Sequence, residues 1–206
     1  STGTLNDANS NTGVGIGVLA ALTSGDRNTV VGFQAGKDNT TGGENAFFGR
    51  LAGCENTTGG ANTGIGSSSI NSNTTGCYNT AIGNSALETN TTASNNVAVG
   101  YRAAGSNTTG TFHASLGACS LLSNTTGAEN TGIGGQALKC NTTGSQNTAL
   151  GYASVFTNTT GSSNTGVGCG ALFANTTGSL NAAFGKDSLK TNTTGEQNTG
   201  LGHAAL

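Results

Sequence analysis

The sequence contains no proline, methionine or tryptophan, and only 8% of its 206 residues are charged. An ordinary soluble domain carries about 25% charged residues, so asparagine, threonine, serine and backbone groups must solvate this surface. Seven basic and nine acidic residues are scattered singly and give a net charge of -2. Because no basic patch is available to neutralise phosphates, we expect no nucleic-acid binding. No apolar run approaches the roughly 18 residues that a membrane-spanning helix needs, so we expect no membrane span.

Methionine is missing at the first position too, where the chain begins with Ser1. We interpret the chain as a processed protein or as a window on a longer array. A signal peptide that had already been removed would leave no trace, so its absence does not argue against secretion.

What the sequence does contain is glycine, with 36 residues, and a repeat of 17 residues that starts with Asn-Thr-Thr-Gly. Residues 141–157 read N-T-T-G-S-Q-N-T-A-L-G-Y-A-S-V-F-T, and the pattern restarts at Asn158. A fixed period of this kind is the signature of a solenoid. We expect one repeat domain over residues 1–206, with degenerate N-terminal coils in 1–38 and regular coils in 39–206. The leading asparagine recurs ten times: Asn39, Asn56, Asn73, Asn90, Asn107, Asn124, Asn141, Asn158, Asn175 and Asn192.

One column of the repeat is apolar in every coil, and a glycine always follows it. Because the chain is otherwise so polar, we expect this column to point inward and form the core. Its members are Val14, Val31, Phe48, Ile65, Ile82, Val99, Leu116, Ile133, Leu150, Val167, Phe184 and Leu201. A second apolar column lies five residues further on, as in Leu87 and Leu138, and alanine or serine often precedes it. The constant glycine suits a corner with positive φ or a close backbone approach.

These spacings favour strands over helices. Apolar residues recur at intervals of 5 and 12 rather than 3 and 4, and glycine, asparagine and threonine are poor helix formers. We predict an all-β fold, a parallel β-solenoid (β-helix or β-roll) of about twelve 17-residue coils, each with three short faces and stacked about 4.8 Å apart. A disordered chain would have no reason to keep one apolar column. Two apolar columns bury little surface per coil, so we also expect burial between chains.

The five cysteines stand at five different places in the repeat, whereas a disulfide ladder or a metal site would use one column. We interpret them as substitutions at small or apolar positions, with one or two disulfides as the alternative. The two histidines, His113 and His203, share no column with a recurring acid or nucleophile. We therefore expect neither enzymatic activity nor a cofactor or metal. His113 replaces the second asparagine of its coil.

Three interpretations of the repeated Asn-Thr-Thr-Gly stay open. The asparagines can stack their amides in a ladder from coil to coil. Each N-T-T is also an acceptor sequence for N-glycosylation. Finally, rows of asparagine and threonine can form a flat face that matches ice or binds carbohydrate.

Several segments resemble a known family. N-T-A-I-G-N-S-A (residues 79–86), N-V-A-V-G-Y-R-A (96–103) and N-T-A-L-G-Y-A-S (147–154) resemble the head repeats of YadA-like trimeric autotransporter adhesins. The N-T-T-G arrays are similar to those of tail-fibre-like surface proteins. The resemblance implies a left-handed parallel β-roll, three chains packed side by side, and a surface that binds host or matrix ligands. The adhesin repeat is shorter than the one found here.

We therefore expect a secreted or cell-surface, non-enzymatic fibre or adhesin segment. Its first partner would be itself, as a homotrimer or as a head-to-tail filament joined through uncapped solenoid ends. A host surface, matrix surface or glycan would be a further partner. The alternative is an ice-binding or carbohydrate-binding module that uses the Asn/Thr face.

Overall fold

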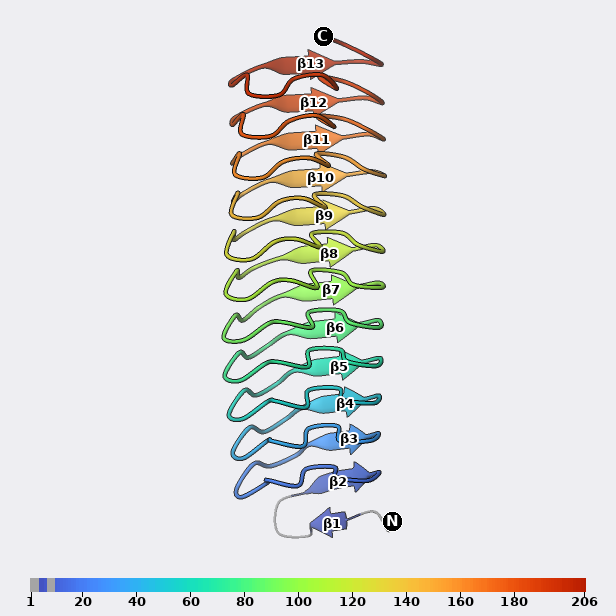
Figure 1. Cartoon of the computed structure of the whole chain (residues 1–206), viewed down its shortest axis with the longest axis vertical. Coiled ribbons are helices and arrows are strands. Elements are labelled where there is room, and N and C mark those ends of the chain that lie inside the picture. Colours follow the sequence, from blue (N-terminus) through green and yellow to red (C-terminus); the bar gives the residue numbers. More distant parts are fainter. Residues whose placement is uncertain (1–3, 7–9) are drawn as a thin grey trace.

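The computed structural model describes residues 4–6 and 10–206, which form one continuous stack of coils (Figure 1). The described residues contain thirteen strands and no helix, and the strands form one sheet in sequence order. Twelve of them, β2 to β13, pair in parallel with a register of 17 residues. The predicted all-β parallel solenoid is confirmed. The strands are β1 (Thr4–Asn6), β2 (Asn11–Val14), β3 (Thr29–Val31), β4 (Ala46–Phe48), β5 (Thr63–Ile65), β6 (Thr80–Ile82), β7 (Val97–Val99), β8 (Ala114–Leu116), β9 (Thr131–Ile133), β10 (Thr148–Leu150), β11 (Thr165–Val167), β12 (Ala182–Phe184) and β13 (Thr199–Leu201).

The N-terminal end departs from the repeat. β1 runs antiparallel to β2, with Thr4 opposite Gly13, and points against all other strands in Figure 1. Residues 4–6 thus add no further parallel rung to the twelve that β2 to β13 form. The twelve parallel strands are separated by eleven steps of 17 residues, so the predicted stack of about twelve coils has twelve rungs. β1 also covers the edge of β2 that a head-to-tail contact would use.

Only one side of each coil is a strand, so the three short faces expected from the sequence are not three strands. The other sides are turns and bends. Their backbone groups still bond between coils: the Thr40 N–H donates to the Thr57 carbonyl at 2.8 Å, and the Glu55 N–H donates to the Asn71 carbonyl at 2.8 Å. Backbone hydrogen bonds between coils are therefore also formed by the turns and bends, which lack regular strand geometry.

The side of the strands that faces the core is the opposite of the one predicted. Alternate residues of a strand point to opposite sides, and the residue that points inward is the middle one of each strand, such as Val30, Phe47 or Ala81, all with no exposed surface. The flanking residues point outward. The prediction that the first apolar column forms the core is therefore wrong. Nine of its members expose 37–79% of their surface and three are half-buried; we call this set the outer apolar column: Val14, Val31, Phe48, Ile65, Ile82, Val99, Leu116, Ile133, Leu150, Val167, Phe184 and Leu201.

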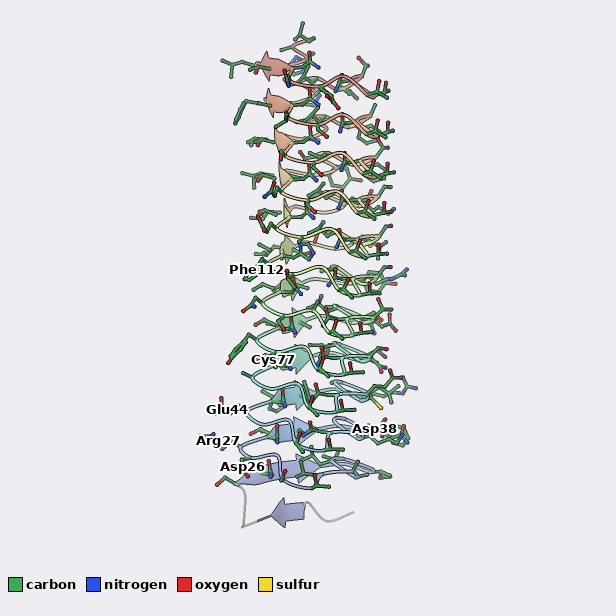
Figure 2. The ribbon with its side chains drawn as sticks, turned by 90° about the vertical axis from the view of Figure 1, so that its left-hand side faces the viewer. Asp26, Arg27, Asp38, Glu44, Cys77 and Phe112 are labelled. Carbon is green, nitrogen blue, oxygen red and sulfur yellow. The ribbon has the colours of Figure 1, made fainter. Side chains whose placement is uncertain are left out.

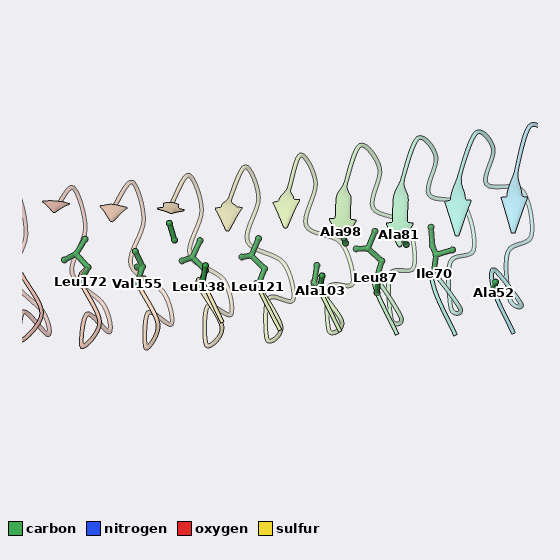
Figure 3. Packing of buried hydrophobic residues seen from close by; sticks show 14 of the residues in the cluster. Ala52, Ile70, Ala81, Leu87, Ala98, Ala103, Leu121, Leu138, Val155 and Leu172 are labelled. Atoms are coloured by element: carbon green, nitrogen blue, oxygen red, sulfur yellow. The ribbon is translucent and has the colours of Figure 1, made fainter. Parts of the chain in front are cut away.

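The second apolar column does form the core, as predicted. Leu87, Leu121 and Leu138 have no exposed surface, and they pack against inward alanines of the sheet such as Ala81 and Ala98 (Figure 3). We call this set the inner apolar column: Leu19, Ile70, Leu87, Leu121, Leu138, Val155, Leu172, Leu189 and Leu206. Leu19 is half-buried and Leu206, at the C-terminal end of the stack, is 81% exposed.

Across this core, a large residue on one wall faces a small residue on the other. Where the inner column has Gly53, the facing strand residue is Phe47, and a Cβ on Gly53 would lie 2.5 Å from the Phe47 ring. In most other coils a leucine in the inner column faces glycine, alanine or serine in the strand. Interiors are close-packed, so in most coils one large residue fills the narrow space from one wall or from the other.

The inner apolar column has an unusual backbone. Leu87 and Ile70 have φ of 50° and 47°, in the left-handed region. This conformation costs roughly 1–2 kcal/mol for an L-residue, and for a β-branched one it is rare. Complete burial of the side chain offsets that cost. The glycine that follows the outer apolar column in every coil is required for a different reason. Gly49, with φ of 145°, has no room for a Cβ beside the Gly66 carbonyl of the next coil.

Candidate functional site

The leading asparagines of the repeat form a ladder inside the stack. The Asn56 side-chain Nδ2 donates to Asn39 Oδ1 at 2.8 Å and to the Gly59 carbonyl at 2.9 Å, and the same pair of bonds recurs along the stack. Nine of the ten have no exposed surface and the last is half-buried. We call this set the first asparagine ladder: Asn39, Asn56, Asn73, Asn90, Asn107, Asn124, Asn141, Asn158, Asn175 and Asn192.

A second asparagine ladder precedes the strands. Asn28 Oδ1 accepts the backbone N–H of Asn45 at 3.0 Å, and Asn28 Nδ2 donates to the Gly42 carbonyl at 3.0 Å. That carbonyl also accepts from Asn39 Nδ2 at 2.9 Å, so the two ladders meet on one oxygen. The interior is thus half polar and half apolar, and buried amides are paired as burial requires. The second ladder comprises Asn11, Asn28, Asn45, Asn62, Asn79, Asn96, Asn130, Asn147, Asn164, Asn181 and Asn198.

His113 takes the place of an asparagine in the second ladder. Its backbone N–H donates to Asn96 Oδ1 at 3.0 Å, and its Nδ1 accepts the Asn130 backbone N–H at 3.2 Å, as an asparagine Oδ1 would. The ring is 3% exposed. Burial lowers its pKa from 6.5 to about 4, so the imidazole is neutral at pH 7. In this position it is a structural replacement with no acid or nucleophile bonded to it.

The paired threonines after each leading asparagine differ in role. Thr40 Oγ1 donates to the Thr57 carbonyl at 3.0 Å, and this bond repeats in the next coils. The second threonine, Thr41, is exposed. Because the asparagines point inward, the outward surface here is a single threonine row rather than a flat face of asparagine and threonine.

The outward face of β2–β13 runs along the whole parallel stack. It carries the outer apolar column beside a second outward column, two residues earlier, of threonine, alanine and valine, as in Thr63, Ala114 and Val97. Neither column contains a charged residue. This face is therefore a strip without charge, with one apolar edge.

Among the described residues no group of three or more histidine, cysteine, aspartate or glutamate side chains could hold a metal ion. All five cysteines are free. Asp187 is bonded to Lys186 and Lys190 at 2.7 and 2.9 Å, and these bonds lower its pKa to about 2. No helix in the described part of the chain is long and apolar enough to cross a membrane.

Comparison of the chain with protein-family models, with curated proteins and with solved structures found no match.

Proposed function

We propose that the chain is a non-enzymatic structural segment of an extracellular fibre or adhesin, whose solenoids associate side by side through the outward face of the sheet. The observation that supports this is the outer apolar column. A chain with so few apolar residues places one of them outside on each of twelve successive strands.

The size of the strip fits an interface. Nine side chains that are 37–79% exposed leave on the order of 600 Å² of apolar surface, at the upper end of the largest patches on monomeric proteins. With the neighbouring threonine column the face approaches the roughly 800 Å² per partner of a stable interface. No charge on either column opposes contact between two such faces.

Side-by-side association is favoured over head-to-tail stacking. β1 pairs with β2 and covers the edge at the N-terminal end, so end-to-end growth through that edge would have to displace it. Three copies around a common axis would match the resemblance to trimeric adhesin heads, and a host or matrix ligand would then contact the sides that remain outside. The Asn/Thr face is less suited to binding, because its asparagines are buried and bonded to one another.

Sedimentation equilibrium tests the proposal. Wild type should form a discrete homo-oligomer, and a variant with Ile82→Lys, Leu116→Lys and Leu150→Lys should be monomeric with an unchanged circular dichroism spectrum. A matched variant with lysine at three exposed threonines away from the sheet, Thr92, Thr126 and Thr160, should associate like wild type. A monomeric wild type at high concentration, or a lysine-substituted sheet that still associates, would reject it.

A further inference from the structure

A cleft opens on the corner of the stack that leads into the strands. It spans four successive coils, from Arg27 at one end to Tyr78 at the other, and is a shallow groove of about 180 Å³ that is largely open to solvent. Glu44 lines it beside Arg27, and Gly60 and Ala61 form part of its floor. Figure 2 shows Arg27 and Glu44 along this edge of the stack. Three steps between coils correspond to a length of about 14 Å.

The cleft exists because two coils lack a side chain at one position. We call the residues that stand four positions after the first residue of each repeat the corner column, for example Gly43 four positions after Asn39. Where this column has serine, the hydroxyl accepts the N–H of the corner residue one coil earlier: Ser145 Oγ from Ala128 and Ser162 Oγ from Ser145, both at 3.0 Å. The column comprises Asp26, Gly43, Gly60, Cys77, Ser94, Thr111, Ala128, Ser145, Ser162, Ser179 and Glu196.

In the cleft this hydroxyl is missing. The residue after Gly43 in the corner column is Gly60, which has no side chain, and the Gly43 N–H has no acceptor among the described residues. A Cβ on Gly60 would lie 3.1 Å from the Gly43 carbonyl oxygen and 3.8 Å from the Gly43 nitrogen, so the side chain that Gly60 lacks is the one that would lie beside this N–H. One coil later, the Gly60 N–H does have an acceptor, because it donates to Cys77 Sγ at 3.3 Å. The floor of the cleft therefore presents a backbone donor at a place built to receive a hydroxyl oxygen.

The residues at the two ends of the cleft add an aromatic ring and an ion pair to this backbone donor. Tyr78 is 67% exposed, so its ring offers a flat apolar face at one end. At the other end Arg27 and Glu44 are paired at 2.8 Å, and their remaining N–H groups and oxygens can donate to and accept from neighbouring hydroxyls. The pair is neutral overall, which favours an uncharged ligand.

We propose that this cleft binds a short neutral oligosaccharide, with one sugar hydroxyl accepting the Gly43 N–H and one ring lying on Tyr78. Such an arrangement, an apolar face with a few fixed polar groups, is typical of small-ligand sites. The site lies outside the sheet face and does not depend on the association of chains proposed above.

Titration with neutral trisaccharides of glucose, galactose and N-acetylglucosamine, followed by calorimetry and by saturation-transfer NMR, tests the site. At least one should bind saturably to wild type. Gly60→Ser restores the corner serine that other coils carry, so it should fold normally and place its own hydroxyl on the Gly43 N–H. Loss of that bond should weaken binding about tenfold, and the serine side chain in the cleft should weaken it further.

Matched variants separate the cleft from the rest of the stack. Ser162→Gly removes a corner serine in a distant coil and should leave binding unchanged. Tyr78→Ala should weaken binding, whereas Phe112→Ala, an exposed aromatic two coils further along the same edge (Figure 2), should not. The proposal is overturned if no trisaccharide binds wild type, or if Gly60→Ser binds as wild type does. It is equally overturned if Ser162→Gly or Phe112→Ala abolishes binding.

Discussion

The buried His113 should make the stability of this stack depend on pH. Its Nδ1 accepts the Asn130 N–H at 3.2 Å, and a proton on Nδ1 would place two donors against each other. Burial is the largest cause that lowers the pKa from 6.5 to about 4, and hydrogen bonding to the Gly127 backbone offsets it only in part. The folded chain therefore holds this ring neutral under conditions in which an unfolded chain would protonate it.

The sign and size of the effect follow from these two values. Between pH 6.5 and 4 the unfolded state binds more protons than the folded state at His113, so the unfolding free energy falls as the pH falls through this range. It is insensitive to this group above pH 6.5. At 1.36 kcal/mol per pKa unit the loss amounts to about 3 kcal/mol once the pH is below 4.

His113→Asn supplies the control, because it restores the residue that the second asparagine ladder has in the neighbouring coils, Asn96 and Asn130. Guanidinium unfolding followed by circular dichroism at pH 7, 5.5 and 4 should show wild type losing more stability than the variant at each step down. Carboxylates titrate in both proteins, so the difference between them isolates His113. Parallel pH profiles for the two proteins would refute the assignment of a neutral, ladder-bound ring.

Four further predictions concern the register, the asparagines and the thiols. Leu150→Asp, on the outer apolar column, should change stability by about 1 kcal/mol or less, whereas Leu138→Asp buries an unpaired charge and should cost about 3–5 kcal/mol; equal melting temperatures would contradict the described register. Asn141 should carry no glycan on secretory expression, because its Nδ2 already donates two buried bonds, and intact-mass spectrometry would detect one. Asn141→Ala should cost about 2–3 kcal/mol, since the buried Asn124 Oδ1 loses its donor and the buried Asn158 Nδ2 loses an acceptor; chemical denaturation measures this. Cys54 is buried and burial raises its pKa, while Cys169 is exposed, so a thiol reagent should modify Cys169 first.

The sequence predicted the period, the parallel stacking and the inner apolar column, because these follow from which residues recur at which interval. It did not reveal which face of the strand points inward. Threonine and the outer apolar residue stand on the same side of the strand, and the inward residue between them is small in most coils. A column of glycine and alanine gives no sign in the sequence that it is buried. It is nevertheless buried, because the leucine side chains of the inner apolar column already fill the narrow interior and leave room only for small residues.

A signal for the correct register was nevertheless present in one coil. Phe47 is the one large aromatic at the inward strand position, and its coil has Gly53 where other coils have leucine. When a large residue in one column is accompanied by a small residue in another, the two columns must pack against each other. The outer apolar column varies between valine and phenylalanine, as at Phe48 and Phe184, without such compensation, because it faces outward. The left-handed conformations at Leu87 and Ile70 had no comparable signal, since they arise from the path of the coil and not from local preference.

In a repeat protein the regular positions specify the stack, and functional differences must come either from a column as a whole or from the coils that break the pattern. The outer apolar column is the first kind: folding one chain does not require it outside, so its persistence over twelve strands argues for a partner with the same periodicity. The paired glycines Gly43 and Gly60 are the second kind, because they remove two side chains from one corner and leave a donor without an acceptor. A partner that covers the sheet and a ligand that enters the corner would use different sides of the coil. The two proposals can therefore hold at once, and the lysine-substituted sheet and Gly60→Ser test them separately.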